Sequence, residues 1–242
     1  MNRLSESIRS NGAMPDRLLK LFSRRKNMPA AKVLRYAEEW YAITETFGLA
    51  AASYLAVIVA EIQISTGKRR LILEELLQRS AAISSDDLGL FRGACGDSDK
   101  GPIHFRLFER MCKKLGPVAI PEKDLLPETL RLRHKIDQLF QTLTGGIAVF
   151  RVVEPIAYKI VEHQLPLFLA ARRDSSKVYR RKELDYILLH LEIEGEHAEE
   201  SAALANLLLE SGGKRDDLRK DVEDLSRLFG YYWRAIERHV LG

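Results

Sequence analysis

The sequence predicts an all-α protein that folds as one helical bundle. Apolar residues recur three and four positions apart over long segments, which is typical of amphipathic helices, and no stretch alternates as a strand does. Short groups of Gly, Pro and Ser separate these segments. With 242 residues, 46% of them apolar, and no visible linker, we expect residues 1–242 to form a single domain around one core. Residues 1–29 are expected to be an arm with a short helix.

Each of these interruptions marks the boundary between two expected elements. An amphipathic segment is expected from Asp16 to Arg24, and Pro29 precedes a long helix whose Ala-rich second half should be buried. The stretch from Ser84 to Pro102 is rich in Ser, Asp and Gly and is expected to be a loop. The helices are predicted over residues 30–64, 68–83, 103–115, 127–145, 147–173, 179–211 and 216–240.

Glycine and proline set the boundaries in the second half of the chain. The pair Gly145 and Gly146 is predicted to break the chain between two helices. Pro155 and Pro166 lie inside the following helical pattern, where proline removes a backbone hydrogen bond. We therefore expect a bend near Glu162.

Composition excludes several classes of protein. The net charge of +4 is spread over 38 basic and 34 acidic residues, so no nucleic-acid-binding surface is predicted. The longest uncharged run, Thr46 to Ala60, is shorter than the roughly 20 residues that span a bilayer, and no membrane span is expected. The first residues lack the features of a secretory signal, which favours the cytoplasm. Cys95 and Cys112 are too few for a disulfide framework, and neither is assigned a catalytic role.

The predicted helix over 179–211 carries a cluster of metal-ligand side chains. At roughly 100° per residue, His190, Glu194 and His197 fall within about 60° of one another on its apolar face. Burying an unpaired carboxylate costs several kcal/mol, and a bound cation would remove that cost. A single histidine on this face would favour a half-exposed side chain solvated by water, but three ligand side chains on one face favour a metal site.

A further carboxylate is expected from the preceding helix. Glu162 lies in an apolar segment that is predicted to be buried, and helix-bundle metal sites collect carboxylates and histidines from facing helices. Glu154 is the weaker candidate, and the Tyr158 hydroxyl is a candidate hydrogen-bond partner for it.

These residues resemble the heme-oxygenase-like di-iron oxidases and oxygenases, a family that includes the chlamydial protein associating with death domains. His190, Glu194 and His197 match the family's His, acid, His spacing on the last core helix, with Glu where Asp is more usual. The segment from Glu162 to Pro166 is similar to the family's Glu-x-Gln-hydrophobic-Pro setting. His104 opens a His-x-x-Leu-Phe pattern that is similar to the family's earlier ligand helix.

The resemblance implies a heme-oxygenase-like bundle that binds two ferrous ions, or one iron and one manganese, and uses dioxygen as co-substrate. The substrate would be a small molecule of a biosynthetic pathway, such as an amino acid or a fatty acid. The family's Glu-Glu-x-Gly signature is replaced here by Asp86-Asp87-Leu88-Gly89, so that Asp87, Asp97 and Glu75 stay open as the missing acidic ligand. The implied metal ligands are His104, Glu162, His190, Glu194 and His197.

The sequence leaves two other functions open, and it does not decide which residues line a substrate pocket. One is a metal-free enzyme like thiaminase II or pyrroloquinoline-quinone synthase, and the other is a non-catalytic scaffold that keeps the fold. No nucleic-acid or membrane partner is expected, and a homodimer is left open. Candidate pocket residues, for which core packing is the favoured role, are Trp40, Tyr41, Phe47 and Tyr54. Candidate anchors for a substrate carboxylate are Arg106, Arg151 and Lys159.

Overall fold

The computed structural model of the chain describes residues 12–13, 27–88 and 103–241, leaving aside the side chains of 86, 87, 193–196 and 241. The predicted segment from Asp16 to Arg24 and most of the predicted loop lie outside these residues. In chain order the elements are β1 (Met28–Pro29), α3 (Ala30–Gln63), α4 (Gly67–Asp87), α5 (His104–Cys112), η1 (Glu122–Asp124), α6 (Pro127–Leu139), α7 (Leu143–Leu169), β2 (Ala171–Arg173), β3 (Ser176–Lys177), η2 (Arg181–Glu183), α8 (Asp185–Glu210), α9 (Arg215–Ile236) and η3 (Glu237–Leu241).

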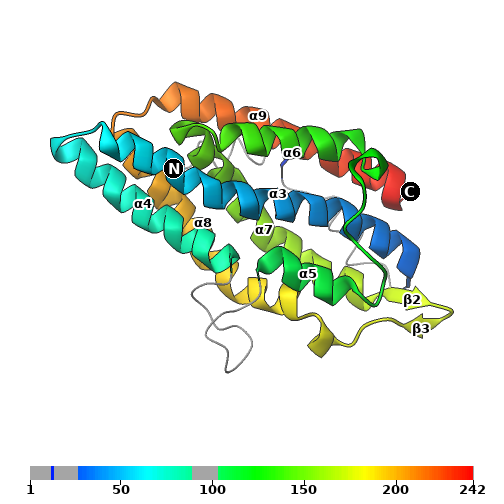
Figure 1. The fold of residues 1–242 in the computed structure, drawn as a ribbon. Coiled ribbons are helices and arrows are strands. Elements are labelled where there is room, and N and C mark those ends of the chain that lie inside the picture. The colour runs from blue at the N-terminus through cyan, green and yellow to red at the C-terminus, as the bar shows by residue number, and fades with distance from the viewer. Residues whose placement is uncertain (1–11, 14–26, 89–102, 242) are drawn as a thin grey trace.

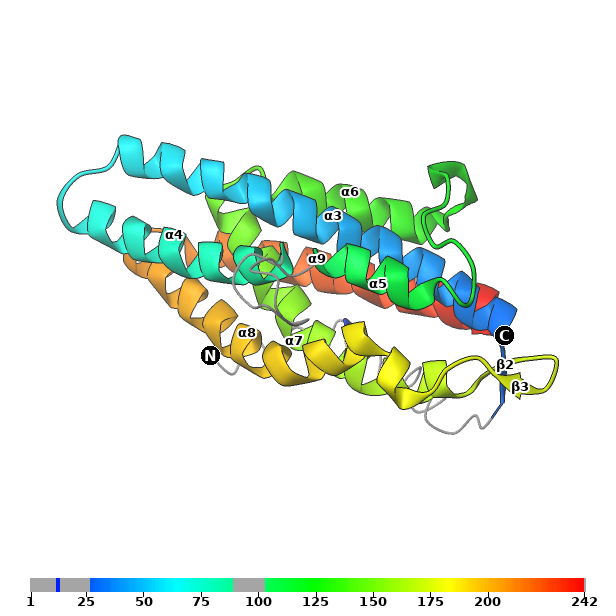
Figure 2. The same ribbon diagram turned by 60° about the horizontal axis from the view of Figure 1, so that its bottom comes forward.

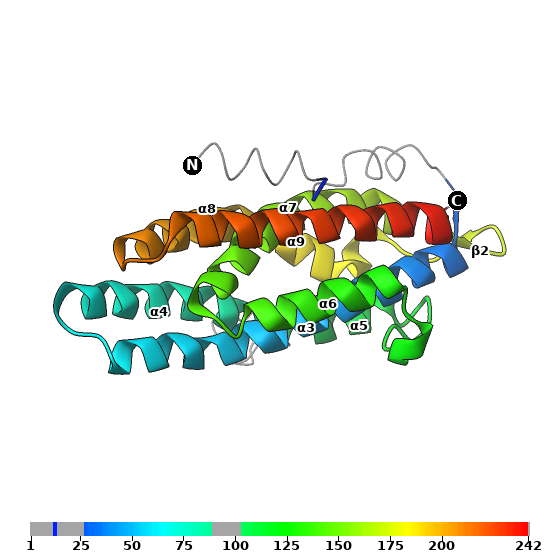
Figure 3. The same cartoon turned by 90° about the horizontal axis from the view of Figure 1, so that it is seen from above.

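The helices form a bundle of two layers, and the all-α prediction is confirmed (Figure 1). Seen from above, α3, α4, α5 and α6 make one layer, and α7, α8 and α9 make the other (Figure 3). Helix α3 runs through the first layer with α4 returning beside it, and α8 follows α7 back along the second (Figure 2). The centre of the molecule is therefore enclosed by α3, α5, α7 and α8.

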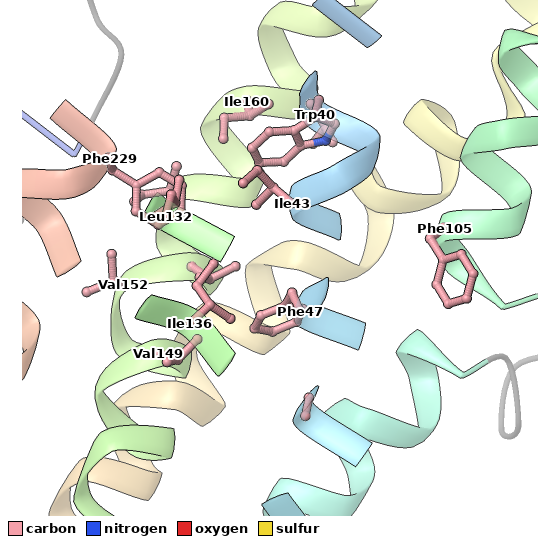
Figure 4. Close-up of a cluster of buried hydrophobic side chains, with 14 of the residues drawn as sticks. Trp40, Ile43, Phe47, Phe105, Leu132, Ile136, Val149, Val152, Ile160 and Phe229 are labelled. Atoms are coloured by element: carbon pink, nitrogen blue, oxygen red, sulfur yellow. The ribbon is translucent and has the colours of Figure 1, made fainter. Parts of the chain in front are cut away.

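The core is formed where side chains of four helices converge. Figure 4 shows Trp40, Ile43 and Phe47 of α3 facing residues of α6, α7 and α9. Phe47 also contacts Phe140 and Phe150, with ring centroids 5.8 and 5.9 Å away. Such aromatic pairs bury large apolar areas and prefer tilted or edge-to-face contacts, as seen here.

Helix α3 has the length and apolarity of a membrane span. Within its 34 residues, an 18-residue window has a mean hydropathy of 1.6. In this structure it packs against α4, α5, α6 and α7, and Ala51, Tyr54 and Ile58 are fully buried. The central helix of a bundle meets the same criteria of length and composition, because it too is surrounded by apolar side chains.

Three short strands depart from the prediction of a purely helical chain. β2 pairs antiparallel with β3, and β1 pairs parallel with β2. The turn between β2 and β3 holds Asp174 and Ser175 at φ of 49° and 67°, a left-handed conformation. Because residues 171–173 pair as a strand, the helix predicted for 147–173 ends at Leu169, and the helix predicted to begin at Tyr179 begins at Asp185. This small sheet joins the entry to α3 with the exit from α7.

The paired glycines do not break the chain as predicted. Helix α7 begins at Leu143, and Thr142 caps it by accepting a hydrogen bond from the backbone N–H of Gly145. Both glycines lie in the first turn of this helix. A Cβ on Gly146 would lie 2.3 Å from the Tyr54 ring. Glycine is needed here for close packing and not for a change of direction.

Candidate active site

A small cavity lies inside the bundle, between α3, α5, α7 and α8. Its volume is about 40 Å³, enough for a few water-sized groups. Apolar side chains form most of its wall, and the polar residues are concentrated on α5, α7 and α8. The described residues that line it are Trp40, Ile43, Thr44, Phe47, Gly48, His104, Phe105, Val153, Glu154, Ala157, Tyr186 and His190.

Two predicted ligands, His104 and His190, meet in this cavity. His104 opens α5, His190 lies in the second turn of α8, and their ring centroids are 4.6 Å apart. The His190 Nδ1–H donates to the carbonyl oxygen of Tyr186 at 2.8 Å. Burial and the neighbouring His104 hold the pKa of His190 well below its usual range, so its ring is neutral. A neutral ring with Nδ1 protonated keeps the Nε2 lone pair for a proton or a metal ion.

The third histidine, His197, faces an acid from α7. Its Nδ1 lies 3.5 Å from Oε2 of Glu154, and both side chains are more than nine-tenths buried. His197 and His190 lie seven residues apart on α8, about two turns, which places them on one face of that helix. The Glu154 carboxylate thus approaches the histidine face of α8 from the opposite helix.

Among the described residues, Glu39 and Glu154 are the acids that are fully buried. The Glu39 carboxylate has a structural partner at each oxygen. It pairs with Arg35 and accepts hydrogen bonds from Thr129 and from the Leu126 backbone N–H at the start of α6. Glu39 therefore caps a helix, whereas Glu154 lines the cavity.

Glu162 does not face this site, contrary to the predicted burial of its segment. Its side chain is 47% exposed, and its Oε2 accepts from Lys159 Nζ at 3.3 Å. Glu154 and Glu162 are eight residues apart, so their directions on α7 differ by about 80°. The polar neighbours Lys159 and His163 mark the outer face of the helix in the sequence. Glu154, by contrast, follows residues 147–153, which are apolar apart from Arg151, and this sequence signal could have identified it.

The acidic positions proposed for a second metal are not assembled in the described part of the chain. Glu75 is half-exposed and pairs with Arg79, away from the cavity. Asp97 and the side chains of Asp87 and Glu194 lie outside the described residues. No three of the described His, Cys, Asp and Glu side chains lie close enough to share one ion.

The candidate pocket residues divide into two groups. Trp40 and Phe47 line the cavity, whereas Tyr54 is a core residue that donates to the Leu143 carbonyl oxygen at 2.7 Å. Tyr41 lies outside the lining and donates to Glu45 at 3.1 Å. Tyr158, proposed as a partner of Glu154, is exposed at the surface.

None of the three candidate carboxylate anchors lines the cavity. Arg106 and Lys159 lie at the surface and pair with Glu109 and Glu162. Arg151 is buried, and it donates to the Ser201 hydroxyl at 3.1 Å, about one helical turn from the contact between Glu154 and His197.

Cys112 is a buried thiol whose pKa burial raises well above the ordinary value. We expect iodoacetamide to leave Cys112 unmodified in the folded protein and to alkylate it after unfolding in guanidinium chloride. Mass spectrometry of the peptide that contains Cys112 would measure this. Rapid alkylation of the native protein at Cys112 would show instead an accessible, reactive thiol.

Comparison with solved structures shows a likeness in fold. The structure resembles the crystal structure of a TenA homologue from Pseudomonas syringae pv. tomato, with a TM-score of 0.67 over 98% of this chain and 92% of that one. The sequences are 12% identical, so the likeness concerns the fold alone. No family model matches the chain, and no curated protein matches its sequence. The fold is a heme-oxygenase-like helical bundle, as the sequence predicts.

Proposed function

We propose that this chain is a cytoplasmic non-heme di-iron enzyme that uses dioxygen to oxidise a small molecule. The observation that supports this proposal most directly is the presence of two buried pairs inside the bundle, His104 beside His190 and Glu154 beside His197. Imidazole and carboxylate donors without thiolate suit iron or manganese. Glu154 takes the place that the sequence reading gave to Glu162.

The residues fit such a centre in their chemistry. His190 is neutral, with its Nδ1–H fixed on a backbone carbonyl, as is usual for a histidine that coordinates a metal through Nε2. We propose that Glu194, which lies between His190 and His197 on the same helical face, supplies a further carboxylate. Bound iron would supply electrons to dioxygen for the oxidation.

The other residues of the cavity wall would control the access of water and the movement of protons. Apolar side chains such as Ile43 and Val153 exclude water from the cavity and thereby strengthen electrostatic interactions inside it. The Glu154 carboxylate, beside His197 Nδ1, is placed to hold or pass a proton at Oε2.

Iron binding and dioxygen uptake test the proposal together. Chelator-treated full chain is mixed with ferrous ions without oxygen, its iron content is measured, and dioxygen is then admitted while uptake and visible absorption are recorded. We expect His190→Ala to weaken iron binding by more than about 100-fold, beyond the 10- to 100-fold typical of outer residues around a metal. The controls His134→Ala and His239→Ala should bind iron normally, because both rings are exposed. Unchanged iron binding by His190→Ala would contradict the proposal.

A second candidate is a metal-free enzyme of the thiaminase II type, which the likeness to a TenA homologue favours. In that case Glu154 would act as the acid or base in the cavity without any ion. Chelator-treated protein would then hydrolyse thiamine, and Glu154→Gln would abolish the hydrolysis. Iron-dependent dioxygen uptake without thiamine hydrolysis would exclude this candidate.

A further inference from the structure

The indole nitrogen of Trp40 is a buried hydrogen-bond donor that has no acceptor among the described residues. Its side chain is 3% exposed, so bulk water does not reach it. An indole N–H can only donate, and leaving a buried donor unpaired is unfavourable and uncommon. The other tryptophan shows the ordinary arrangement, since Trp233 Nε1 donates to the Ala13 carbonyl oxygen at 2.9 Å.

Trp40 is held rigidly at the wall of the cavity. Its ring stacks on Trp233 with centroids 5.9 Å apart, which limits its rotation. In Figure 4 the nitrogen lies on the edge of the ring that is turned away from Ile160. Because Trp40 lines the cavity, a small group bound there could accept the hydrogen bond that the protein does not supply.

The rest of the wall limits the chemistry of that group. Ile43, Phe47, Phe105, Val153 and Ala157 form an apolar surface that favours an apolar molecule. No Lys or Arg is present among the described residues of the lining, while the Glu154 carboxyl is. An anionic ligand would lie beside this carboxyl group without a lysine or arginine to balance its charge, whereas a neutral oxygen needs no such partner.

We infer that the cavity binds an apolar molecule through a neutral carbonyl oxygen, which accepts a hydrogen bond from Trp40 Nε1. The inference rests on the proposed function only in treating this molecule as the substrate. Binding itself needs no metal, so it can be tested on chelator-treated protein. An amino acid or a fatty-acid anion is disfavoured in that form of the protein, because no described cation faces the cavity.

The chain has two tryptophans, so ¹⁵N-labelled protein gives two indole N–H signals, and Trp233 serves as an internal reference. Acetone, a ketone of a few heavy atoms that suits the size of the cavity, is added to the full chain after chelator treatment. We expect the Trp40 signal, assigned with Trp40→Phe, to move downfield and saturate, while the Trp233 signal stays in place. Isobutane, which is similar in shape to acetone and has no acceptor, should not move the Trp40 signal downfield. Absence of a saturable shift with acetone would overturn the inference.

Trp40→Phe keeps an aromatic ring and removes the donor. Affinities for acetone and isobutane are measured from methyl signals of Ile43 and Val153, which line the cavity. We expect the variant to bind acetone about fivefold more weakly, as for the loss of one neutral hydrogen bond, and to bind isobutane as before. An equal loss for both ligands would assign Trp40 a packing role and overturn the inference. Tighter binding of acetate than of acetone, which has the same number of heavy atoms, would also overturn it, in favour of an anion site.

Discussion

Glu154→Gln is expected to abolish iron uptake, whereas Glu162→Gln is expected to leave it intact. The two acids lie on the same helix, but Glu154 is 3% exposed and faces His197, while Glu162 is half-exposed and pairs with Lys159. Glutamine keeps the size of the side chain and removes the charge that would bind a cation. We expect the affinity for ferrous ions to fall by more than about 100-fold in the first variant, as for loss of a direct ligand.

The measurement is anaerobic titration of each variant with ferrous ions, followed by metal analysis after removal of unbound iron. The paired variants control for changes in the net charge of the protein, because both lose one carboxylate from α7. Equal losses of affinity would contradict the assignment of Glu154. A loss confined to Glu162→Gln would mean that the Glu162 side chain turns inward when metal binds.

Gly146→Ala is expected to destabilise the protein strongly. The added Cβ would lie 2.3 Å from the ring of Tyr54, which is fully buried and contacts Phe140 and Phe150. Neither the ring nor the α7 backbone can move without disrupting this cluster. Overpacking of this kind costs about 3 kcal/mol or more, which corresponds to a fall of roughly 6 to 12 °C in Tm for a chain of this size.

Gly48→Ala is the matched control, because Gly48 also lies inside a helix. Its Cβ would meet the Phe105 ring at 3.6 Å, an ordinary contact. Replacing glycine by alanine inside a helix then gains up to about 1 kcal/mol, and we expect a Tm slightly above that of the unmodified protein. Thermal unfolding followed by circular dichroism measures both variants. Similar Tm values for the two would show that the contact with Tyr54 is not tight.

Helix positions were largely predictable from local pattern. Helix α3 begins directly after Pro29 and α6 begins at Pro127, as expected from the sequence. The breaks near Gly67 and Gly116 also agree with the structure, because proline and glycine act on the backbone where they stand. The short strands around Ala171 were not predictable in this way. The parallel part of this sheet pairs Ala171 with Met28, which lies more than a hundred residues earlier.

The choice between the two α7 carboxylates shows the limit of reading one segment at a time. Apolar residues flank both acids, and a family-like motif favoured Glu162. Which of the two faces the interior depends on how α7 is rotated about its axis against α8, and this rotation is set by the packing of both helices. The same packing leaves the indole nitrogen of Trp40 without an acceptor, which no sequence pattern indicates.

The sequence by itself determined the fold class and the shared face of His190, Glu194 and His197, because both follow from the helical repeat within a continuous segment. Only the tertiary structure decided that Glu154 joins the histidines and that Trp40 and His104 line the same cavity. These residues come from different helices, and their approach depends on contacts between segments far apart in the chain. Local propensity carries no information about such contacts.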